Sequence, residues 1–343
     1  MRFGAELPVF WAVYPLPGPG LLGYGGAMAR DPVLTFTQKG IYCPDGDFYI
    51  DPTHGVGRAL VTHGHSDHAR RGSDSYLCTD AALPVIRHRL GRITAEGIAY
   101  GARRQIGGVT VSFHPAGHVP GSAQIRVERA GEVWVVSGDY KVTDDGFCEA
   151  FAPVACDTFI TECTFGLPIF QWQPDTQVLA DIATWWAQNT AEGRVSVLAA
   201  YSFGKAQRLI AGVPLQGPIY AHDAVQDVTD VLRGQGYPLG PTFRMDGGVP
   251  RDALIIAPPN VLNSDWAAGL GPVSVGFASG WMALGARRKG VGAAFTLSDH
   301  ADWPGLIQAV RETGATRVFA THGYVEPFRR WLSQAGYDAG IVR

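Results

Sequence analysis

Short apolar runs separated by polar turns predict a protein of mixed α/β type. In the first half of the chain, alternating apolar and polar positions predict strands at 34–37, 48–50, 109–114, 123–128, 133–137 and 158–161. Between these strands, a helical pattern covers residues 81–90. Glycine, proline and aspartate separate the runs and are typical of turns. The expected fold class is therefore α/β, with polar residues placed at strand ends.

The middle of the chain has a different rhythm, in which strands and helices alternate. Helices are predicted at 176–191 and 204–211, and strands at 196–200 and 254–257. This alternation indicates a small separate domain with its own sheet. Further along the chain, strands at 294–297 and 317–320 each lead directly into a histidine-containing segment, and a helix is predicted between them at 303–313.

The most informative run of polar residues is Thr62-His63-Gly64-His65-Ser66-Asp67-His68, which follows the apolar stretch 59–61. A strand that ends in a sharp turn can direct His63 and His65 to one side and Asp67 and His68 to the other. Such an arrangement holds two metal ions close together, as in enzymes that hydrolyse esters and phosphodiesters. A single histidine is usually part of a solvated surface, but four potential ligands at this spacing favour a metal site. Imidazole with carboxylate suits zinc, manganese or iron.

Three further candidate ligands follow other predicted strands, and each is next to a glycine. They are His118, Asp139 and His322. A lone histidine after a strand is more often structural, but three such residues strengthen the metal interpretation. A carboxylate at position 139 can bridge two metals. The remaining histidines are treated as structural, namely His54, His88, His114 and His222.

Composition and charge limit the classes of ligand. The chain has 343 residues, of which 46% are hydrophobic and 17% charged, as in globular proteins. Its net charge of -3 gives no overall basic field, so a nucleic acid would have to bind in a local basic groove. Candidates for that groove are Arg70, Arg71, Arg103, Arg104, Arg287, Arg288 and Lys289.

Cysteine usage and hydropathy bear on the compartment. The five cysteines form no C-x-x-C pair, which fits reduced thiols in a cytoplasmic protein. No apolar run approaches the ~18 residues of a membrane span. Residues 1–27 are proline-rich and make a poor signal peptide. They are either a loosely ordered extension or untranslated sequence before a start at Met28.

Taken together, these motifs resemble the metallo-β-lactamase-fold hydrolases of the β-CASP nuclease branch. The run 63–68, His118 and Asp139 match the metal motifs, and 161–166, 297–302 and 321–323 match the acidic motif and two downstream histidine motifs. The stretches 40–44, 136–141, 277–282 and 297–305 resemble bacterial ligase-associated DNA exonucleases. The resemblance implies an αββα sandwich formed by 28–166 and 291–343, with a β-CASP cap domain inserted at 167–290 and an extension at 1–27.

The resemblance also implies a role for each site residue. His63, His65 and His118 would hold one metal and Asp67, His68 and His322 the other, while Asp139 would bridge both. Asp51 would orient a ligand histidine, although a turn aspartate at a strand end is an equally good interpretation. His300 would be the proton donor held by Glu162, and Asp67 is counted with them among the catalytic residues. Ser202 and Lys205 would bind a terminal phosphate, the alternative being an ordinary strand–helix turn.

The implied function is metal-dependent exonucleolytic degradation of single-stranded DNA or a duplex end, giving 5′-phosphate and 3′-hydroxyl products. Two divalent ions are expected, zinc before manganese, with 5′-to-3′ polarity by analogy to crosslink-repair exonucleases and a repair role beside an ATP-dependent DNA ligase. An RNase of the same branch is the main alternative, because His322 completes the second metal site. An ester hydrolase is disfavoured by the cap, and a non-catalytic homologue is disfavoured by the complete ligand set.

Overall fold

The computed structural model describes residues 31–263, 265–285 and 292–342. By its contacts the chain divides into the units Met1–Pro32 and Val33–Arg343, and everything below concerns the second unit. The expectations for residues 1–27 and for a start at Met28 lie outside the described residues. The same holds for Arg287, Arg288 and Lys289 of the expected basic groove.

The first sheet has six strands in sequence order. They are β1 (Thr35–Thr37), β2 (Gly40–Cys43), β3 (Phe48–Ile50), β4 (Arg58–Leu60), β5 (Ser75–Thr79) and β6 (Ala95–Ile98). The pairs β1–β2 and β2–β3 are antiparallel, and β3 to β6 run parallel. Helix α1 (Leu83–Leu90) connects β5 to β6, and its Ile86 and Leu90 pack against Ala59 and Cys78 on one face of the sheet.

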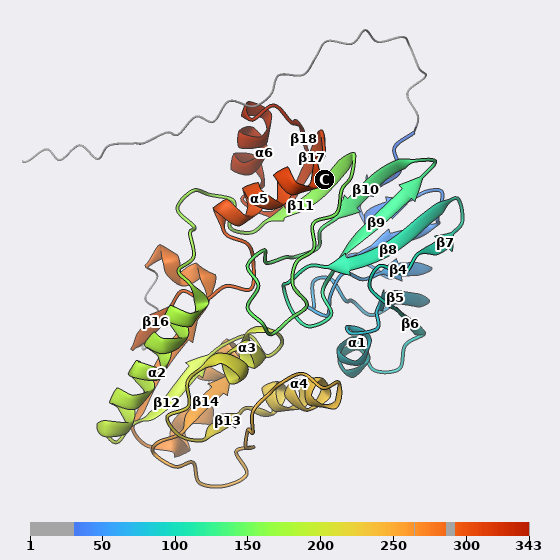
Figure 1. Ribbon diagram of the computed structural model, residues 1–343. Helices are drawn as coiled ribbons and strands as arrows, with labels where there is room; N and C mark the ends of the chain where they lie inside the picture. Colours follow the sequence, from blue (N-terminus) through green and yellow to red (C-terminus); the bar gives the residue numbers. More distant parts are fainter. Residues whose placement is uncertain (1–30, 264, 286–291, 343) are drawn as a thin grey trace, which may run out of the picture. The chain divides into compact units, whose positions relative to one another are not determined.

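The second sheet has seven strands in the order β18-β17-β11-β10-β9-β8-β7. Their bounds are β7 (Arg104–Ile106), β8 (Val109–Pro115), β9 (Ala123–Arg129), β10 (Glu132–Val136), β11 (Thr158–Cys163), β17 (Arg317–Gly323) and β18 (Asp338–Ile341). Helices α5 (Trp303–Thr313) and α6 (Val325–Gln334) lie beside β11 and β17 (Figure 1). They bury Leu306 and Phe328 against Phe159 of β11.

The two sheets share one apolar core. Phe48 and Leu60 from the first sheet pack in the same buried cluster as Phe113, Ile125 and Trp134 from the second. Because helices cover the other faces, the layers run helix, sheet, sheet, helix. Burial on both sides forces each strand to be apolar at its inward positions, which is the alternation that the sequence displays. The predicted α/β class is confirmed.

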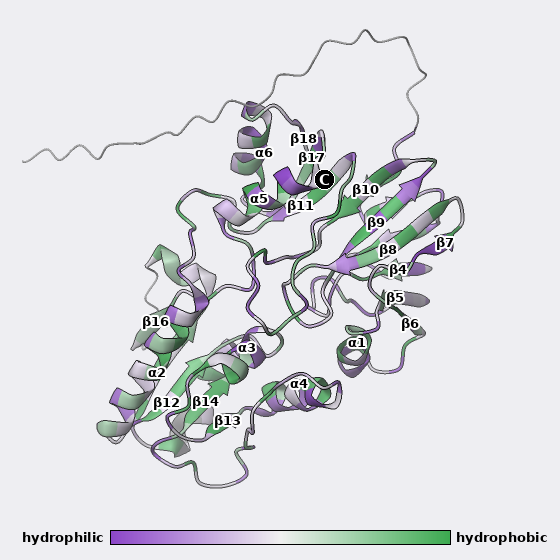
Figure 2. Cartoon of the chain, viewed as in Figure 1, coloured by the Kyte–Doolittle hydropathy of each residue, from purple (hydrophilic) through white to green (hydrophobic). Residues whose placement is uncertain are grey.

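A third sheet has five parallel strands in the order β13-β14-β12-β15-β16. Its strands are β12 (Val195–Ala199), β13 (Ile219–Ala221), β14 (Leu254–Ala257), β15 (Val273–Ala278) and β16 (Ala293–Phe295), with helices α2 (Asp175–Ala191), α3 (Lys205–Gly212) and α4 (Asp223–Gly234). Every residue of β12 and β14 is buried, and Figure 2 colours both strands largely hydrophobic. Such continuous apolar runs are typical of parallel strands covered on both faces.

This third sheet corresponds largely to the middle region that the sequence sets apart. Its last strand, β16, extends to Phe295, beyond residue 290 where the cap domain is predicted to end. The short 3-10 helices η1 (Pro259–Asn263), η2 (Asp265–Leu270) and η3 (Gly280–Leu284) lie between β14 and β16. The division into two domains stays a prediction.

All five cysteines are free thiols, as expected from their spacing. Among the helices that the structure describes, none has the length and hydrophobicity needed to cross a bilayer.

Candidate metal centre

The candidate ligands other than His322 come from loops that follow β4, β8 and β10, and His322 lies within β17. Gly138, which follows β10 and has a φ of +57°, lies against Thr62, which follows β4. A Cβ at position 138 would lie 2.7 Å from Cβ of Thr62. Glycine is therefore required at this close approach, which brings Asp139 next to the histidines after β4.

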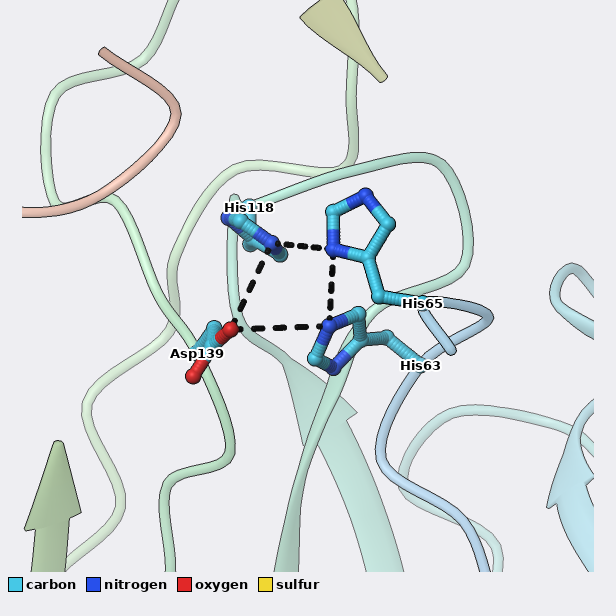
Figure 3. A group of neighbouring side chains, drawn as sticks. All are labelled: His63, His65, His118 and Asp139. Atoms are coloured by element: carbon cyan, nitrogen blue, oxygen red, sulfur yellow. Dashed lines mark hydrogen bonds and ion pairs between the residues drawn. The ribbon is translucent and has the colours of Figure 1, made fainter. Parts of the chain in front are cut away.

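Four of these side chains converge on one point (Figure 3). Nδ1 of His65 is 3.0 Å from Nε2 of His63 and 3.0 Å from Nε2 of His118. The carboxylate Oδ2 of Asp139 lies 3.6 Å from Nε2 of His63 and 3.8 Å from Nε2 of His118. His63 and His118 are fully buried.

Hydrogen bonds on the far side of two rings determine which nitrogen carries the proton. Nε2–H of His65 donates to the Phe203 carbonyl at 3.2 Å, and Nδ1–H of His118 donates to the Asp299 carbonyl at 2.8 Å. Because a carbonyl only accepts, the nitrogens that face each other at 3.0 Å both present lone pairs in the neutral rings. Two lone pairs at this distance repel unless a cation lies between them. The donor set therefore fits a metal ion.

The electrostatics of the histidines agree with this geometry. Burial, helped by the charge of neighbouring imidazoles, holds the pKa of His63 and of His118 well below the usual range. Burial also lowers the pKa of His65. All three rings are thus neutral near pH 7, which is the form that binds metals.

A second group of potential ligands shares Asp139 and adds His68 and His322. Nε2 of His68 is 3.4 Å from Oδ2 of Asp139, and it is buried without a hydrogen-bond partner among the described residues. The His322 ring lies 5.2 Å from the His68 ring, and His322 adopts a left-handed φ of 49°. A buried nitrogen with no partner beside a carboxylate fits a second metal ion.

Asp67 belongs to neither group of converging ligands. Its side chain is 59% exposed, and its Oδ2 lies 3.7 Å from Nε2 of His68. Its predicted roles as a ligand and catalytic residue stay predictions.

Asp51 holds the far nitrogen of His68, as the orienting interpretation of this residue expects. Its Oδ2 accepts from Nδ1–H of His68 at 2.7 Å and from Oγ1 of Thr62 at 2.5 Å, while Oδ1 accepts from N–H of Thr62 at 2.8 Å. Burial alone would lower the pKa of His68, but Asp139 and Asp51 outweigh it and raise that pKa well above its usual value. The surroundings of His68 therefore favour positive charge, from a proton or from a metal.

We expect Asp51→Asn to weaken one of the two metal sites. An amide nitrogen in place of Oδ2 would donate to Nδ1 of His68 and shift the ring proton to Nε2, the nitrogen that faces Asp139. Metal affinity at that site should fall about 10–100-fold, measured by metal titration and elemental analysis.

The matched control for this substitution is Asp47→Asn. Asp47, like Asp51, has a left-handed backbone; its φ is 46°. Its carboxylate accepts a hydrogen bond from Tyr42 on the surface. It should bind both ions normally. Equal metal binding by the Asp51 variant and the parent protein would contradict the orienting role.

Glu162 and His300 form a pair on another side of Asp139. Both carboxylate oxygens of Glu162 contact Nδ1 of His300, at 2.9 and 3.0 Å. Glu162 in turn accepts from N–H of Tyr140 at 2.8 Å and from Oγ1 of Thr164 at 2.5 Å, so its position is fixed. Burial alone would lower the pKa of His300, but Glu162, assisted by Asp139, raises it to about 9. Both ring nitrogens of His300 are therefore protonated at neutral pH.

The site opens into a cavity of about 490 Å³. Among the site residues predicted from the sequence, those that line the cavity are His65, Asp67, His118, Asp139, Ser202, Lys205, His300 and His322. Side chains that the sequence analysis did not select also line it, including Arg89, Phe165, Tyr201 and Trp281. None of the groove candidates Arg70, Arg71, Arg103 and Arg104 is among the lining residues.

Lys205 lines this cavity and belongs to a buried ion network. Its Nζ is 2.8 Å from Oδ2 of Asp299 and donates to the Leu297 carbonyl at 3.0 Å. Arg208, one helical turn further along α3, bonds the carboxylates of Asp299 and Asp145 and donates to the His118 carbonyl at 3.1 Å. Lys141 joins Asp145 and Asp175 to the same network. The network fixes α3 against the loop that carries His118.

Asp299 and Arg208 were missed by the sequence analysis, although signals existed. Asp299 precedes the selected His300, and Arg208 lies three residues after Lys205, on the same face of a helix. When an ion pair joins segments this far apart in the chain, its two partners cannot be identified from one sequence.

Comparisons with known proteins bear on the chemistry of this site. No family model matches the chain. A protein of Opitutus terrae named "Probable DNA ligase" is 32% identical over 311 residues, which cover 89% of this chain and 30% of that protein. The endoribonuclease YSH1 of Eremothecium gossypii is 28% identical over 171 residues, covering 48% of this chain and 21% of the relative. Cleavage and polyadenylation specificity factor 73 of Drosophila melanogaster is 24% identical over 182 residues, covering 49% and 26%.

The relatives are named for reactions on nucleic acids. This chain spans less than a third of the length of each of them. The names of the last two relatives, an endoribonuclease and a cleavage factor, fit the nuclease branch that the motifs resemble. Among solved structures, a protein of unknown function from Enterococcus faecalis shares the fold, with a TM-score of 0.57, 12% identity and coverage of 83% of this chain and 79% of that chain.

Proposed function

We propose that this protein is a two-metal phosphodiesterase of the metallo-β-lactamase fold that degrades DNA from an end. The observation that carries the proposal is the convergence of three neutral imidazoles and Asp139 beside a second group that contains Nε2 of His68, a buried nitrogen with no hydrogen-bond partner among the described residues. The helix, sheet, sheet, helix layers and the inserted third sheet agree with a capped sandwich of this kind.

In this proposal His63, His65 and His118 would hold one ion, Asp67, His68 and His322 would hold the other, and Asp139 would serve both groups. Divalent ions bound there, zinc before manganese, would activate water near neutral pH and neutralise phosphate oxygens as charge develops. Asp51 keeps His68 in the tautomer that leaves Nε2 free. The carbonyls of Phe203 and Asp299 do the same for His65 and His118.

His300 is the proposed proton donor to the leaving 3′ oxygen. Glu162 holds Nδ1, which leaves Nε2–H as the available donor, and the raised pKa keeps that proton in place at neutral pH. The products would carry a 5′-phosphate and a 3′-hydroxyl. Ser202 and Lys205, which line the same cavity, are the proposed contacts for a terminal phosphate.

Matched DNA and RNA oligonucleotides, labelled at either end and incubated with a panel of metals, test this function. We expect DNA to shorten progressively from its 5′ end with zinc or manganese, and RNA of the same sequence to be cut more slowly. Internal cuts without progressive shortening would contradict an exonuclease. Intact DNA under every condition would contradict the proposal as a whole.

An RNase is the second candidate function. It is favoured by two relatives, one named an endoribonuclease and the other a cleavage and polyadenylation factor, each matching about half of this chain. DNA is preferred because the Opitutus terrae relative, named a probable DNA ligase, matches 89% of this chain at higher identity. In that relative, a segment similar to this chain lies in one polypeptide with other sequence, which supports joint action with a ligase in DNA repair. Faster cleavage of RNA in the assay above would favour the second candidate.

A further inference from the structure

Two large aromatic side chains are exposed on the wall of the cavity that holds the candidate ligands. Tyr201 is 56% exposed and Trp281 is 39% exposed, and both line that cavity. Aromatic rings of this size are usually buried, and exposed ones in a concave polar site commonly contact a ligand. We propose that Tyr201 and Trp281 stack on unpaired nucleobases beside the scissile phosphate. This inference rests on the proposed nuclease function and names its substrate as single-stranded nucleic acid.

Trp281 is held from behind by other aromatic rings. Its ring centroid lies 4.9 Å from that of Phe165, 6.1 Å from Phe170 and 6.3 Å from Tyr324. Phe165 and Phe170 are fully buried. The backbone N–H of Trp281 also donates to Oγ of Ser279 at 3.3 Å. A ring fixed in this way loses little conformational entropy when a ligand stacks on its open side.

The turn that carries Trp281 lies directly on Phe165. A Cβ at Gly280 would be only 2.5 Å from Cζ of Phe165, so glycine allows this close packing. Phe165 in turn lies 5.9 Å from the ring of His300. Phe165 therefore contacts both Trp281 and the proposed proton donor His300. A base stacked on Trp281 would belong to a nucleotide next to the reacting phosphate.

Tyr201 has no evident structural reason for its position. It follows β12, and its carbonyl accepts from N–H of Ala206 at 3.1 Å, which fixes the backbone. Its ring and hydroxyl make no stacking contact or hydrogen bond with other residues in the described part of the chain. Two residues later, the Phe203 carbonyl binds His65, so Tyr201 is anchored close to the ligand cluster.

Stacking on these rings requires bases whose faces are free. In a duplex each base is already stacked and paired, so its face reaches a protein ring only after fraying. Stacking of one base on an aromatic side chain contributes about 1–3 kcal/mol and is tolerant of sequence. The preferred substrate is therefore a single strand or a single-stranded tail, with little dependence on base identity.

The test compares substrates of equal length and charge that differ only in their bases. One is oligothymidylate, and the other carries abasic tetrahydrofuran residues at the nucleotides that flank the cleaved bond. With the metal-loaded full-length protein, kcat/KM should be at least about 10-fold lower for the abasic substrate, because each lost stacking contact contributes about 1–3 kcal/mol. Trp281→Ala and Tyr201→Ser should lower kcat/KM for oligothymidylate and reduce the difference between the two substrates. Trp281→Phe should restore much of kcat/KM for oligothymidylate and much of the difference between the two substrates.

Phe243→Ala is the matched control, because Phe243 is a 49% exposed aromatic that does not line the cavity. It should cleave both substrates as the parent protein does. Equal cleavage of normal and abasic strands by the parent protein would overturn the inference, as would full discrimination by both cavity variants. A fully paired duplex end cleaved faster than a single strand would also overturn it. Failure to cleave any oligonucleotide would instead count against the proposed function.

Discussion

Replacing His65 by alanine is expected to remove one metal ion and nearly all activity. Nε2 of His63 and Nε2 of His118 each lie 3.0 Å from Nδ1 of His65, so its loss leaves two lone pairs without the third ligand. We expect kcat/KM to fall at least about 10³-fold, equivalent to about 4 kcal/mol of transition-state stabilisation. Elemental analysis and the oligonucleotide assay measure the two effects on the same preparation.

His88→Ala is the control for this substitution, because His88 is an exposed histidine on α1 that does not line the cavity. His65→Ala also removes the hydrogen bond to the Phe203 carbonyl, which contributes about 1 kcal/mol to folding. Thermal unfolding should therefore shift only slightly beyond the effect of metal loss. A variant that keeps both ions and normal turnover would exclude His65 as a ligand.

Replacing His300 by alanine should separate proton donation from metal binding. His300 contacts Glu162 and lines the cavity, and it lies outside the two histidine-rich groups but forms a third group of potential ligands with Asp139 and Glu162. We expect kcat to fall about 10²–10⁴-fold while both ions remain bound, because a general acid contributes about that much. In the parent protein, kcat should also fall as the pH rises through about 9, where His300 loses its proton, and the variant should lack this fall.

The choice of leaving group provides the decisive control. Thymidine 5′-(p-nitrophenyl phosphate) releases a phenolate that needs no proton at neutral pH, whereas a nucleotide 3′ oxygen does. His300→Ala should therefore slow oligonucleotide cleavage far more than release of p-nitrophenol. Equal slowing of both reactions would assign His300 to metal binding or structure instead of proton transfer.

The ligand set could be chosen from the sequence because each member follows an apolar run and lies beside characteristic polar or glycine residues. Strands at 48–50, 109–114 and 254–257 have alternating or continuous apolar patterns, and the structure places strands there. The local signal is strong for such elements because burial of one or both faces dictates the residues. The helix predicted at 303–313 is also confirmed, starting after Asp302, whose side chain accepts from N–H of Gly305.

Other features could not be obtained from one sequence, because they depend on contacts between distant segments. The carbonyls that fix His65 and His118 belong to residues 138 and 181 positions away. A main-chain carbonyl leaves no trace in the residue type. The edge strand β18 (Asp338–Ile341) was missed for a different reason, since its exposed and half-buried positions give no clear alternation.

The hydrogen bond from His65 to the Phe203 carbonyl has a thermodynamic consequence. Phe203 precedes α3, whereas His65 follows β4 of the first sheet, so one metal ligand receives its orientation from a different layer of the protein. Any motion that withdrew Phe203 would weaken the hold of His65 on the ion. Reciprocity then requires that a bound ion stabilise the observed position of Phe203 by the same free energy.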